Sequence, residues 1–261
     1  MGTPNPNNLL LGAGSVLFDR FTADGKSTGF RHLGNVDSFT VNTAVEKLTK
    51  KNAMDGMKGI YAEVIIGTTV TATMAMTEFD PENLALAMLG VTSAFTQAAQ
   101  AAVTDQTFGP DAADVMLDRW YDLGALNVVV TDVKQGTTTL AAEDYEVNAT
   151  AGMIRLRPEG AAVAGQELTW SGSVPAITAA NNKSIVKALA AGSIKGRLKY
   201  ISADNQVIGP KTIINVPNIT LAPDGDLGFI SEEFGTFNLA GTIAADMSRP
   251  ADNRYYETIY L

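Results

Sequence analysis

The chain has 261 residues, no cysteine and one histidine, and its formal net charge at pH 7 is −9. Its length suits one large β domain or two smaller ones, and its hydrophobic content of 46% is typical of folded proteins. The lack of cysteine excludes disulfides, thiolate metal sites and cysteine nucleophiles, and a single histidine excludes a histidine-rich metal site. The acidic balance argues against a protein that grips nucleic acid through its phosphates.

The N-terminal part of the sequence carries no signal for export or membrane insertion. Residues 9–17 are apolar, but no basic flank precedes them and no clear cleavage site follows, so we expect a buried strand. No run approaches the ~18–20 apolar residues that a membrane-spanning helix requires. The sequence therefore predicts a soluble protein, made and folded in cytoplasm, with no membrane partner.

The first part of the chain is predicted to consist of strands joined by turns. Residues 15–21 form the first expected strand, and residues 22–29 are rich in turn-forming residues. A second strand is expected over residues 30–41, with a break at Gly34-Asn35.

A polar, lysine-rich segment separates two further predicted strands, at residues 40–45 and 60–76. This segment, residues 46–59, is expected to be an arm outside the core, because lysine is almost never fully buried unless paired. We expect a partner outside the fold to use the arm, and we favour another copy of the same chain. The residues assigned to this contact are Lys47, Lys50, Lys51, Asp55 and Lys58.

Residues 80–90 carry the signals of a short helix. Asp80 is suited to cap the N-terminus, Pro81 to the first helical position and Glu82 to the positive end of the helix dipole. Gly90 is expected to form the C-terminal cap. The side chains expected to pack on a sheet are those of Leu84, Met88 and Leu89.

The stretch after this helix departs from the strand pattern. Residues 94–103 are rich in alanine and predict a helix with little to bury. Between residues 78 and 124 the chain has eight acidic residues and a single base, Arg119. We expect an inserted loop or hairpin subdomain at about residues 91–176, and the sequence leaves its independence open.

The rest of the sequence again predicts strands. They are expected over residues 128–133, 145–147, 153–156, 168–173, 196–202, 212–216, 217–221 and 235–243. Residues 182–191 predict either a helix or a strand, because periodicity cannot decide so short a run. The sequence as a whole predicts a mainly β fold.

The motifs that suggest catalysis or cofactor binding do not hold. Gly25-Lys26-Ser27 resembles the end of a phosphate-binding loop, but the glycine required five residues earlier is replaced by Arg20. His32 would need a positioned nucleophile and a carboxylate, and a lone histidine in a strand region is usually structural. Asp224-Gly225-Asp226 lacks the ligand ladder of a calcium loop and predicts a tight turn. The sequence predicts no enzyme, no metal site and no cofactor.

Several segments occur along the chain in an informative order. They are residues 34–41 (GNVDSFTV), the arm ending in Asp55-Gly56-Met57-Lys58, the strand at 60–76, and residues 79–90 (FDPENLALAMLG), 119–124 (RWYDLG), 144–147 (DYEV), 152–156 (GMIRL), 196–198 (GRL) and 221–227 (LAPDGDL). In this order they resemble the tail tube, or major tail, proteins of long flexible-tailed (siphovirus-type) bacteriophages. The alanine-rich acidic stretch at 91–117 departs from that pattern.

The resemblance implies a fold and an assembly. The implied fold is a β-sandwich or barrel subunit, a single tail-tube domain over residues 1–261 with one short capped helix and a long charged hairpin arm. Subunits of this kind form hexameric rings with an inter-subunit β-barrel, and stacked rings form a hollow tube in the virion. Head-to-tail contacts close into rings by rotation, and ring-on-ring contacts that do not close extend a filament.

The resemblance also implies partners. They are further copies of the chain, the tape-measure, tail-tip and terminator proteins, and double-stranded DNA that passes through the lumen without specific binding. The implied location is the virion, after synthesis and assembly in the host cytoplasm. We expect acidic residues on inner strands to repel the passing phosphates.

Two other classes of protein stay open from the residues alone. A β-sandwich adhesin or carbohydrate-binding module could present Trp120, Tyr121 and Trp170 as an aromatic platform, although two tryptophans in a protein of this size are more often in the core. A hydrolase could use paired Asp or Glu residues, but the sequence distinguishes no pair.

Overall fold

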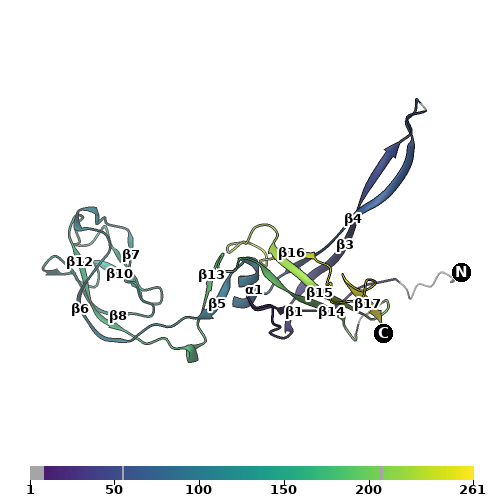
Figure 1. Ribbon diagram of the computed structural model, residues 1–261. Helices are drawn as coiled ribbons and strands as arrows, with labels where there is room; N and C mark the ends of the chain where they lie inside the picture. Colours follow the sequence, from purple (N-terminus) through teal and green to yellow (C-terminus); the bar gives the residue numbers. More distant parts are fainter. Residues whose placement is uncertain (1–8, 55, 206–207) are drawn as a thin grey trace. The chain divides into compact units, whose positions relative to one another are not determined.

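The computed structural model describes residues 9–54, 56–205 and 208–261 (Figure 1). Within these residues the protein is mainly β and has one α-helix and several open sheets, none of which closes into a barrel. The chain divides into two compact units. Unit 1 comprises Met1–Thr92 and Val186–Leu261, and unit 2 comprises Ser93–Ile185, in the region where the sequence suggested an insertion.

Unit 1 is built on one eight-stranded antiparallel sheet. Its strands are β1 (Gly14–Arg20), β2 (Arg31–His32), β3 (Val36–Lys51), β4 (Ile60–Met76), β14 (Ile194–Ser202), β15 (Thr212–Pro223), β16 (Phe237–Ile243) and β17 (Glu257–Tyr260). The order across the sheet is β2-β1-β14-β15-β16-β4-β3, and β17 also pairs with β15. The break expected at Gly34-Asn35 separates β2 from β3.

One face of this sheet forms the core of unit 1. In β4, Val70, Ala72, Met74 and Met76 are buried and alternate with more exposed residues, as the period of two of a strand requires. The helix α1 (Pro81–Ala87) packs against β15 and β16 on this face. The core is therefore closed by one short helix and by loops.

The start of α1 is as the sequence predicts. The carboxylate of Asp80 accepts hydrogen bonds from the backbone amides of Glu82 (2.8 Å) and Asn83 (3.0 Å). The buried face differs from the expected one, because Asn83, Leu86 and the alanines point inward while Leu84 and Met88 are half-exposed. Of the three side chains expected to pack on the sheet, Leu89 is partly buried against the core. The side-chain amide of Asn83 donates to the carbonyl of Leu33 at 2.9 Å, which explains a buried polar residue on this face.

The end of α1 also differs from the prediction. Leu89, not Gly90, adopts the left-handed conformation (φ +48°) that follows the helix. The amide of Gly90 donates to the carbonyl of Ala85 at 2.7 Å, the bond that closes a Schellman turn. Glycine is needed at position 90 because the backbone of Lys187 passes close to it. A Cβ on residue 90 would lie 2.7 Å from the carbonyl oxygen of Lys187.

Strand β15 joins two strands that the sequence separates at Pro217. The register with β14 shifts between Gly196, which lies opposite Ile219, and Leu198, which lies opposite Val216. Pro217 falls within this bulge, where its missing N–H costs no ladder hydrogen bond. The proline therefore bends the strand without ending it.

Unit 2 consists of two sheets that share one hydrophobic core. One sheet has the order β10 (Tyr145–Asn148), β11 (Met153–Leu156), β7 (Trp120–Asp122), and the other has the order β6 (Gln100–Phe108), β12 (Leu168–Val174), β8 (Val129–Gln135), β9 (Thr138–Thr139). Ile154 and Leu156 from the first sheet and Leu168 and Trp170 from the second are fully buried in this core. The two 3₁₀ helices of the described residues are η2 (Ala112–Asp114) and η3 (Ala179–Asn181).

The helix predicted at residues 94–103 is wrong. The structure has strand β5 (Val91–Ala94), and then β6 from Gln100 onward. Val103 lies opposite Gly172 of β12 and is buried, so tertiary pairing overrides the helical preference of the alanines. The ambiguous run at 182–191 contains strand β13 (Ser184–Lys187), which pairs with β5.

Candidate interaction surface

The longest hairpin of the described residues is formed by β3 and β4. The two strands pair from Val36 opposite Met76 to Lys51 opposite Ile60. The register shifts at three places, between Val36 and Ser38, between Glu46 and Lys47, and between Lys50 and Lys51. Residues 46–51, which we expected in a charged arm between two strands, continue strand β3. In Figure 1 the far half of the hairpin extends away from the rest of the unit 1 sheet.

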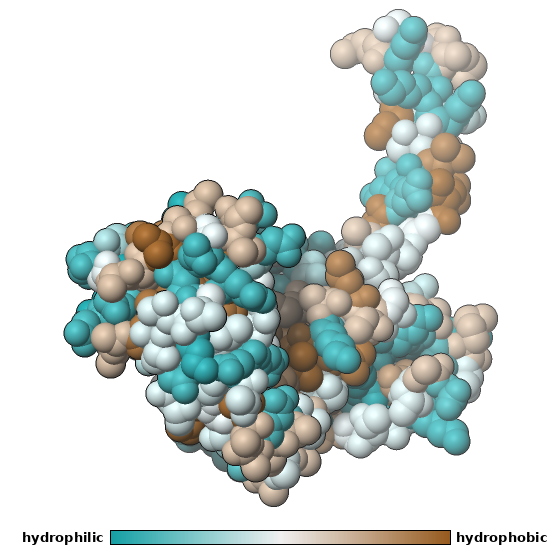
Figure 2. All heavy atoms as spheres, turned by 90° about the vertical axis from the view of Figure 1, so that its left-hand side faces the viewer, coloured by the Kyte–Doolittle hydropathy of each residue, from teal (hydrophilic) through white to brown (hydrophobic). Residues whose placement is uncertain are grey.

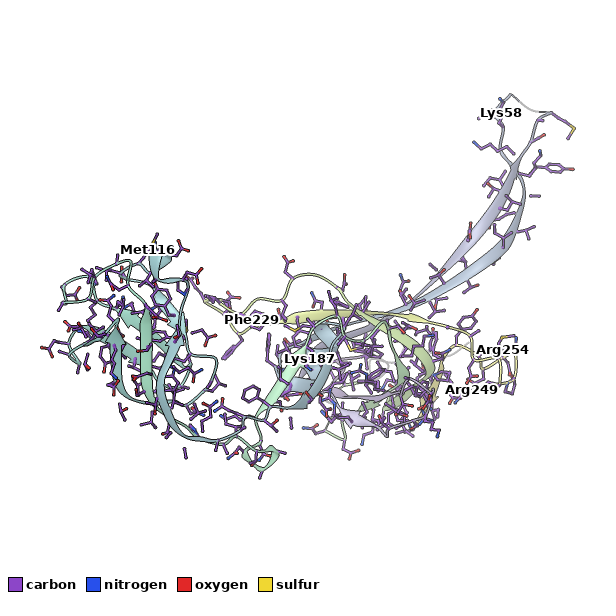
Figure 3. The ribbon with its side chains drawn as sticks, turned by 60° about the vertical axis from the view of Figure 1, so that its left-hand side comes forward. Lys58, Met116, Lys187, Phe229, Arg249 and Arg254 are labelled. Carbon is purple, nitrogen blue, oxygen red and sulfur yellow. The ribbon has the colours of Figure 1, made fainter. Side chains whose placement is uncertain are left out.

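The structure places four of the five predicted contact residues on the far half of this hairpin. Lys47 is paired within the hairpin, because its Nζ lies 2.7 Å from Oε1 of Glu63. Lys50 and Lys51 end strand β3, and Lys58 lies in the connection to β4 with φ +48° (Figure 3). The fifth residue, Asp55, lies outside the described residues.

Three of these lysines form no ion pair with a described residue. Among the described residues, no carboxylate lies within ion-pair distance of Lys50, Lys51 or Lys58. All three side chains are exposed. The end of the hairpin thus offers positive charge to another molecule.

Apolar side chains on the same part of the hairpin were missed by sequence reasoning. Leu48 lies directly opposite Val64, and both are about 60% exposed. Figure 2 shows hydrophobic residues beside hydrophilic ones along this hairpin. The exposed apolar residues here are Val45, Leu48, Met54, Met57, Ile60, Tyr61, Val64, Ile65 and Ile66. The run Ile60–Ile66 was a signal for them, but an exposed strand and a buried one look alike in sequence.

The edges of the unit 1 sheet are open. In the described part of the chain β3 pairs with β4 alone, and the opposite edge is the two-residue strand β2. An edge strand presents unpaired N–H and C=O groups that can pair with another chain. Strand β3, with 16 residues, is long for such an edge.

The solvent face of the same sheet is polar and uncharged around β4. The hydroxyl oxygens of Thr40 and Thr73 lie 2.6 Å apart across the β3–β4 pair. Outward positions on β3, β4, β16 and the adjoining end of β15 are occupied by Ser38, Thr40, Asn42, Thr71, Thr73, Ala75, Asn238, Ala240, Thr242, Thr220 and Ala222. None of these positions carries a carboxylate.

Asp19 is a buried carboxylate with a structural role. It accepts hydrogen bonds from the Ser27 hydroxyl (2.6 Å), from the amides of Thr28 and Gly29 (2.9 Å each), and from Nε of Arg197 (3.0 Å). Burial alone would raise the pKa of Asp19, but these hydrogen bonds outweigh it and hold the pKa below its ordinary value. Ser27 therefore belongs to a turn anchored on β1, as expected once the phosphate-loop motif was rejected.

The aromatic platform considered from the sequence does not form. Trp170 is 1% exposed in the core of unit 2, and Tyr121 is also buried, with its hydroxyl bonded to the backbone of Met116. Trp120 is exposed, and the guanidinium of Arg155 lies 5.5 Å from the centre of its ring. One aromatic ring covered by an arginine is not a stacking surface for sugars.

The described part of the chain contains no cluster of three or more histidine, cysteine, aspartate or glutamate side chains that could hold a metal ion. None of the helices it describes has both the length and the apolar character needed to cross a membrane. The hairpin is the feature of unit 1 that most needs a partner.

The fold and this surface define a mainly β protein of two units with an exposed apolar and cationic hairpin. The chain belongs to the family described as "Protein of unknown function UCP028589", whose model matches residues 9–257. No curated protein matches the chain.

Proposed function

We propose that the chain is a structural subunit that polymerises as stacked hexameric rings into a hollow tube, the tail tube of a long flexible-tailed bacteriophage. The order of segments given above suggests the family, and the β-rich unit 1 with its projecting hairpin supports a self-assembling role. In this proposal the tube is the conduit for DNA ejection.

The observation that carries the proposal is the exposed half of the β3–β4 hairpin. A two-stranded ribbon is marginally stable by itself in water, and apolar residues on it stay in contact with solvent unless a partner covers them. Leu48 and Val64 form an apolar pair on one face, and Ile65, beside Lys47, lies on the other. At least one further molecule is needed to cover both faces. Another copy of the chain is a partner that is present wherever the chain is made.

The open edges of the sheet support the ring. Pairing of the β3 edge with the opposite edge of a neighbouring copy would join the sheets of successive subunits, and rotation would close them into an inter-subunit barrel. Such pairing satisfies backbone groups that are an aggregation hazard in a monomer. The projecting hairpin is then free to act between rings.

The part of the solvent face formed by β4 and β16 carries no charge, and this part supports passage of DNA without specific binding; on β14 the outward positions of the same face are Lys195, Arg197 and Lys199. In the proposed tube the β4 and β16 part lines the bore, where hydroxyl, amide and methyl groups replace the carboxylates that we expected on inner strands. Phosphate binding to proteins depends on lysine and arginine contacts that release counterions. The outward positions on β4 and β16, from Thr71 to Ala75 and from Asn238 to Thr242, offer none.

The adhesin or carbohydrate-binding alternative has no observation in its favour. It relied on three aromatic residues, and two of them, Tyr121 and Trp170, are buried in unit 2. The remaining one, Trp120, is covered on one side by Arg155.

Electron microscopy of the purified chain in negative stain tests the proposal. Rings or tubes, with a sedimentation coefficient far above that of a 27.5 kDa monomer, are the expected result. Raising the protein concentration should lengthen the tubes, because assembly is a mass-action process. A chain that stays monomeric at every concentration and ionic strength contradicts the proposal.

A further inference from the structure

The base of the β3–β4 hairpin borders a large open cavity of about 1070 Å³. Its wall is formed by Asn35 and Asp37 at the start of β3, by Thr77 after β4, by Phe79, and by residues 232–236 of the loop that joins β15 to β16. All of these residues belong to unit 1.

The floor of this cavity is apolar and held in place. The ring of Phe79 packs edge-on against the buried ring of Phe237, with their centres 5.1 Å apart. The loop also approaches Phe79 closely, since a Cβ on Gly235 would lie 3.0 Å from its ring. Phe79 is thus held by Phe237 and by the loop while remaining 37% exposed.

The loop above the floor exposes more apolar surface. Ile230 and Phe234 are 98% and 97% exposed, and Phe229 (Figure 3) is also exposed. A loop that holds three large apolar side chains in water is a feature of interaction surfaces. Phe234 lines the cavity, so this apolar surface is continuous with its wall.

The rim of the cavity is acidic. Glu232, Glu233 and Asp37 all line it. The carboxylate of Asp37 accepts a hydrogen bond from the side chain of Asn35 at 2.8 Å. The carboxylates of Glu232 and Glu233 have no hydrogen bond or ion pair with any residue that the structure describes. An occupant of this cavity should therefore be both apolar and positively charged.

The tip of the β3–β4 hairpin has that chemistry. Lys50, Lys51 and Lys58 lack an ion-pair partner in the described residues, and Met54 is exposed beside them. A methionine side chain is flexible and suits an aromatic surface such as that of Phe79 and Phe234.

The hairpin cannot place its tip in its own cavity. The cavity lies at the Val36–Met76 end of the ladder and the tip at the Lys51–Ile60 end, and a strand of 16 residues spans roughly 50 Å. The paired strands hold the two ends apart, so the contact must join different molecules.

We propose that the cavity between Phe79 and residues 232–236 receives the hairpin tip of a second copy of this chain. The inference rests on the proposed function and deepens it, because it names the two surfaces that join successive rings. A contact between the tip of one hairpin and the base of the next joins two different surfaces and is therefore head-to-tail. Each copy is then shifted along the direction of the hairpin relative to the copy before it. Contacts of this type propagate without closing and so build a filament.

Cysteine cross-linking tests the contact directly, because the chain has no cysteine of its own. Two variants, Lys58→Cys and Phe234→Cys, are mixed in equal amounts, assembled and oxidised. The expected product is a disulfide between position 58 of one copy and position 234 of another, identified by peptide mass. The matched control replaces Phe234→Cys by Met247→Cys, another exposed position of unit 1 that does not line the cavity. Cross-links that form equally well with the control overturn the inference.

A charge exchange tests the same contact without a covalent bond. Glu232→Lys with Glu233→Lys should raise the concentration needed for assembly roughly tenfold or more, since like charges would face each other across the interface. Adding Lys50→Glu, Lys51→Glu and Lys58→Glu to the same chain should restore assembly. The matched control is Asp224→Lys with Asp226→Lys, which alters the same loop outside the cavity and should change nothing.

The outcomes separate this inference from the proposed function. If the wild-type chain forms tubes and the Glu232 and Glu233 variant forms them equally well, the tip-to-cavity contact is wrong and the tube proposal stands. If the wild-type chain forms neither rings nor tubes, and positions 58 and 234 do not cross-link, both are wrong.

Discussion

The base and the tip of the β3–β4 hairpin are made of similar residues with different neighbours. Both halves of β4 are rich in β-branched and apolar side chains, yet Met74 is 1% exposed at the base while Val64 is 60% exposed at the tip. At the base, β16 pairs with β4 and completes a core, whereas the tip half has β3 as its sole strand neighbour in the described chain. The comparison teaches that the adjacent strand, and not the residue type, decides which half of β4 is buried.

The largest expected effect is at the base. Met74→Ala should lower the free energy of unfolding of unit 1 by about 2–5 kcal/mol, because it leaves a cavity in a closed core. Val64→Ala should change it by no more than about 0.5 kcal/mol in the monomer. Urea unfolding followed by far-UV circular dichroism measures both. Trp120 and Trp170 both lie in unit 2, so tryptophan fluorescence gives an internal reference that should not shift.

Charged groups sharpen the comparison. Asp19 is buried on β1 and accepts five hydrogen bonds, two of them from Arg197, whereas the Lys47–Glu63 pair is exposed on the hairpin. Asp19→Asn should destabilise unit 1 by about 1–3 kcal/mol at neutral pH, because charged hydrogen bonds to a buried acceptor are lost. The exposed Asp24→Asn, in the adjacent turn, should be neutral and serves as the control.

The pH dependence of this effect has a defined sign. The pKa of Asp19 is lowered in the folded state, so its contribution is fully present above its unfolded pKa of about 3.8 and is lost as the pH falls through the folded pKa. As the pH falls below about 4, the free energy of unfolding should therefore decrease less for the Asp19→Asn variant than for the wild type. Parallel acid-unfolding curves for the two proteins would contradict this assignment.

A smaller effect on stability is expected from the apolar pair at the tip. Leu48→Thr with Val64→Thr should leave the stability of the monomer within about 0.5 kcal/mol per substitution, because both side chains are already in solvent. Assembly should nevertheless fall, since the interface loses apolar contacts. Sedimentation measures assembly, and Met247→Thr provides an exposed control elsewhere in unit 1. Normal tubes from the double variant would mean that the exposed pair is not covered in the assembly.

The smallest effect on folding is expected from reversing the free lysines. Lys50→Glu with Lys51→Glu and Lys58→Glu should stop tube growth while the circular dichroism spectrum and unfolding curve stay unchanged. Lys47 is kept, because reversing it would set two carboxylates side by side at Glu63. Reversal of the exposed Lys26, Lys183 and Lys187 changes the net charge equally and should not affect growth. Equal loss of growth in both triple variants would indicate an effect of net charge alone.

The sequence predicts well the elements that depend on neighbouring residues, such as a helix cap or a β-branched run. The start of α1 follows from Asp80, Pro81 and Glu82, whose effects act within one turn of the chain. Strand β4 has the bounds that its β-branched run predicts. The exposure of Lys50, Lys51 and Lys58 was predicted correctly because lysine is almost never fully buried unless it is paired, and their role in a contact stays a prediction.

The errors arose where distant neighbours decide the structure. The alanines after position 94 favour a helix until β12 supplies a pairing partner. Tyr121 and Trp170 are residue types of a binding platform, but both are buried in the hydrophobic core that the two sheets of unit 2 share. The cavity beside Phe79 joins residues near positions 35, 78 and 234, and no local pattern connects them.

The sequence by itself determined the β class, the capped helix and the positive charge of the hairpin, because propensity, capping and charge are properties of neighbouring residues. Only the tertiary structure decided which half of β4 is buried, which sheet edge is open and what lies at the base of the hairpin. Burial and edges depend on which strands are adjacent in the sheet, and β16 reaches β4 from a part of the chain far along the sequence. The same apolar strand can therefore serve as core at one end and as interface at the other.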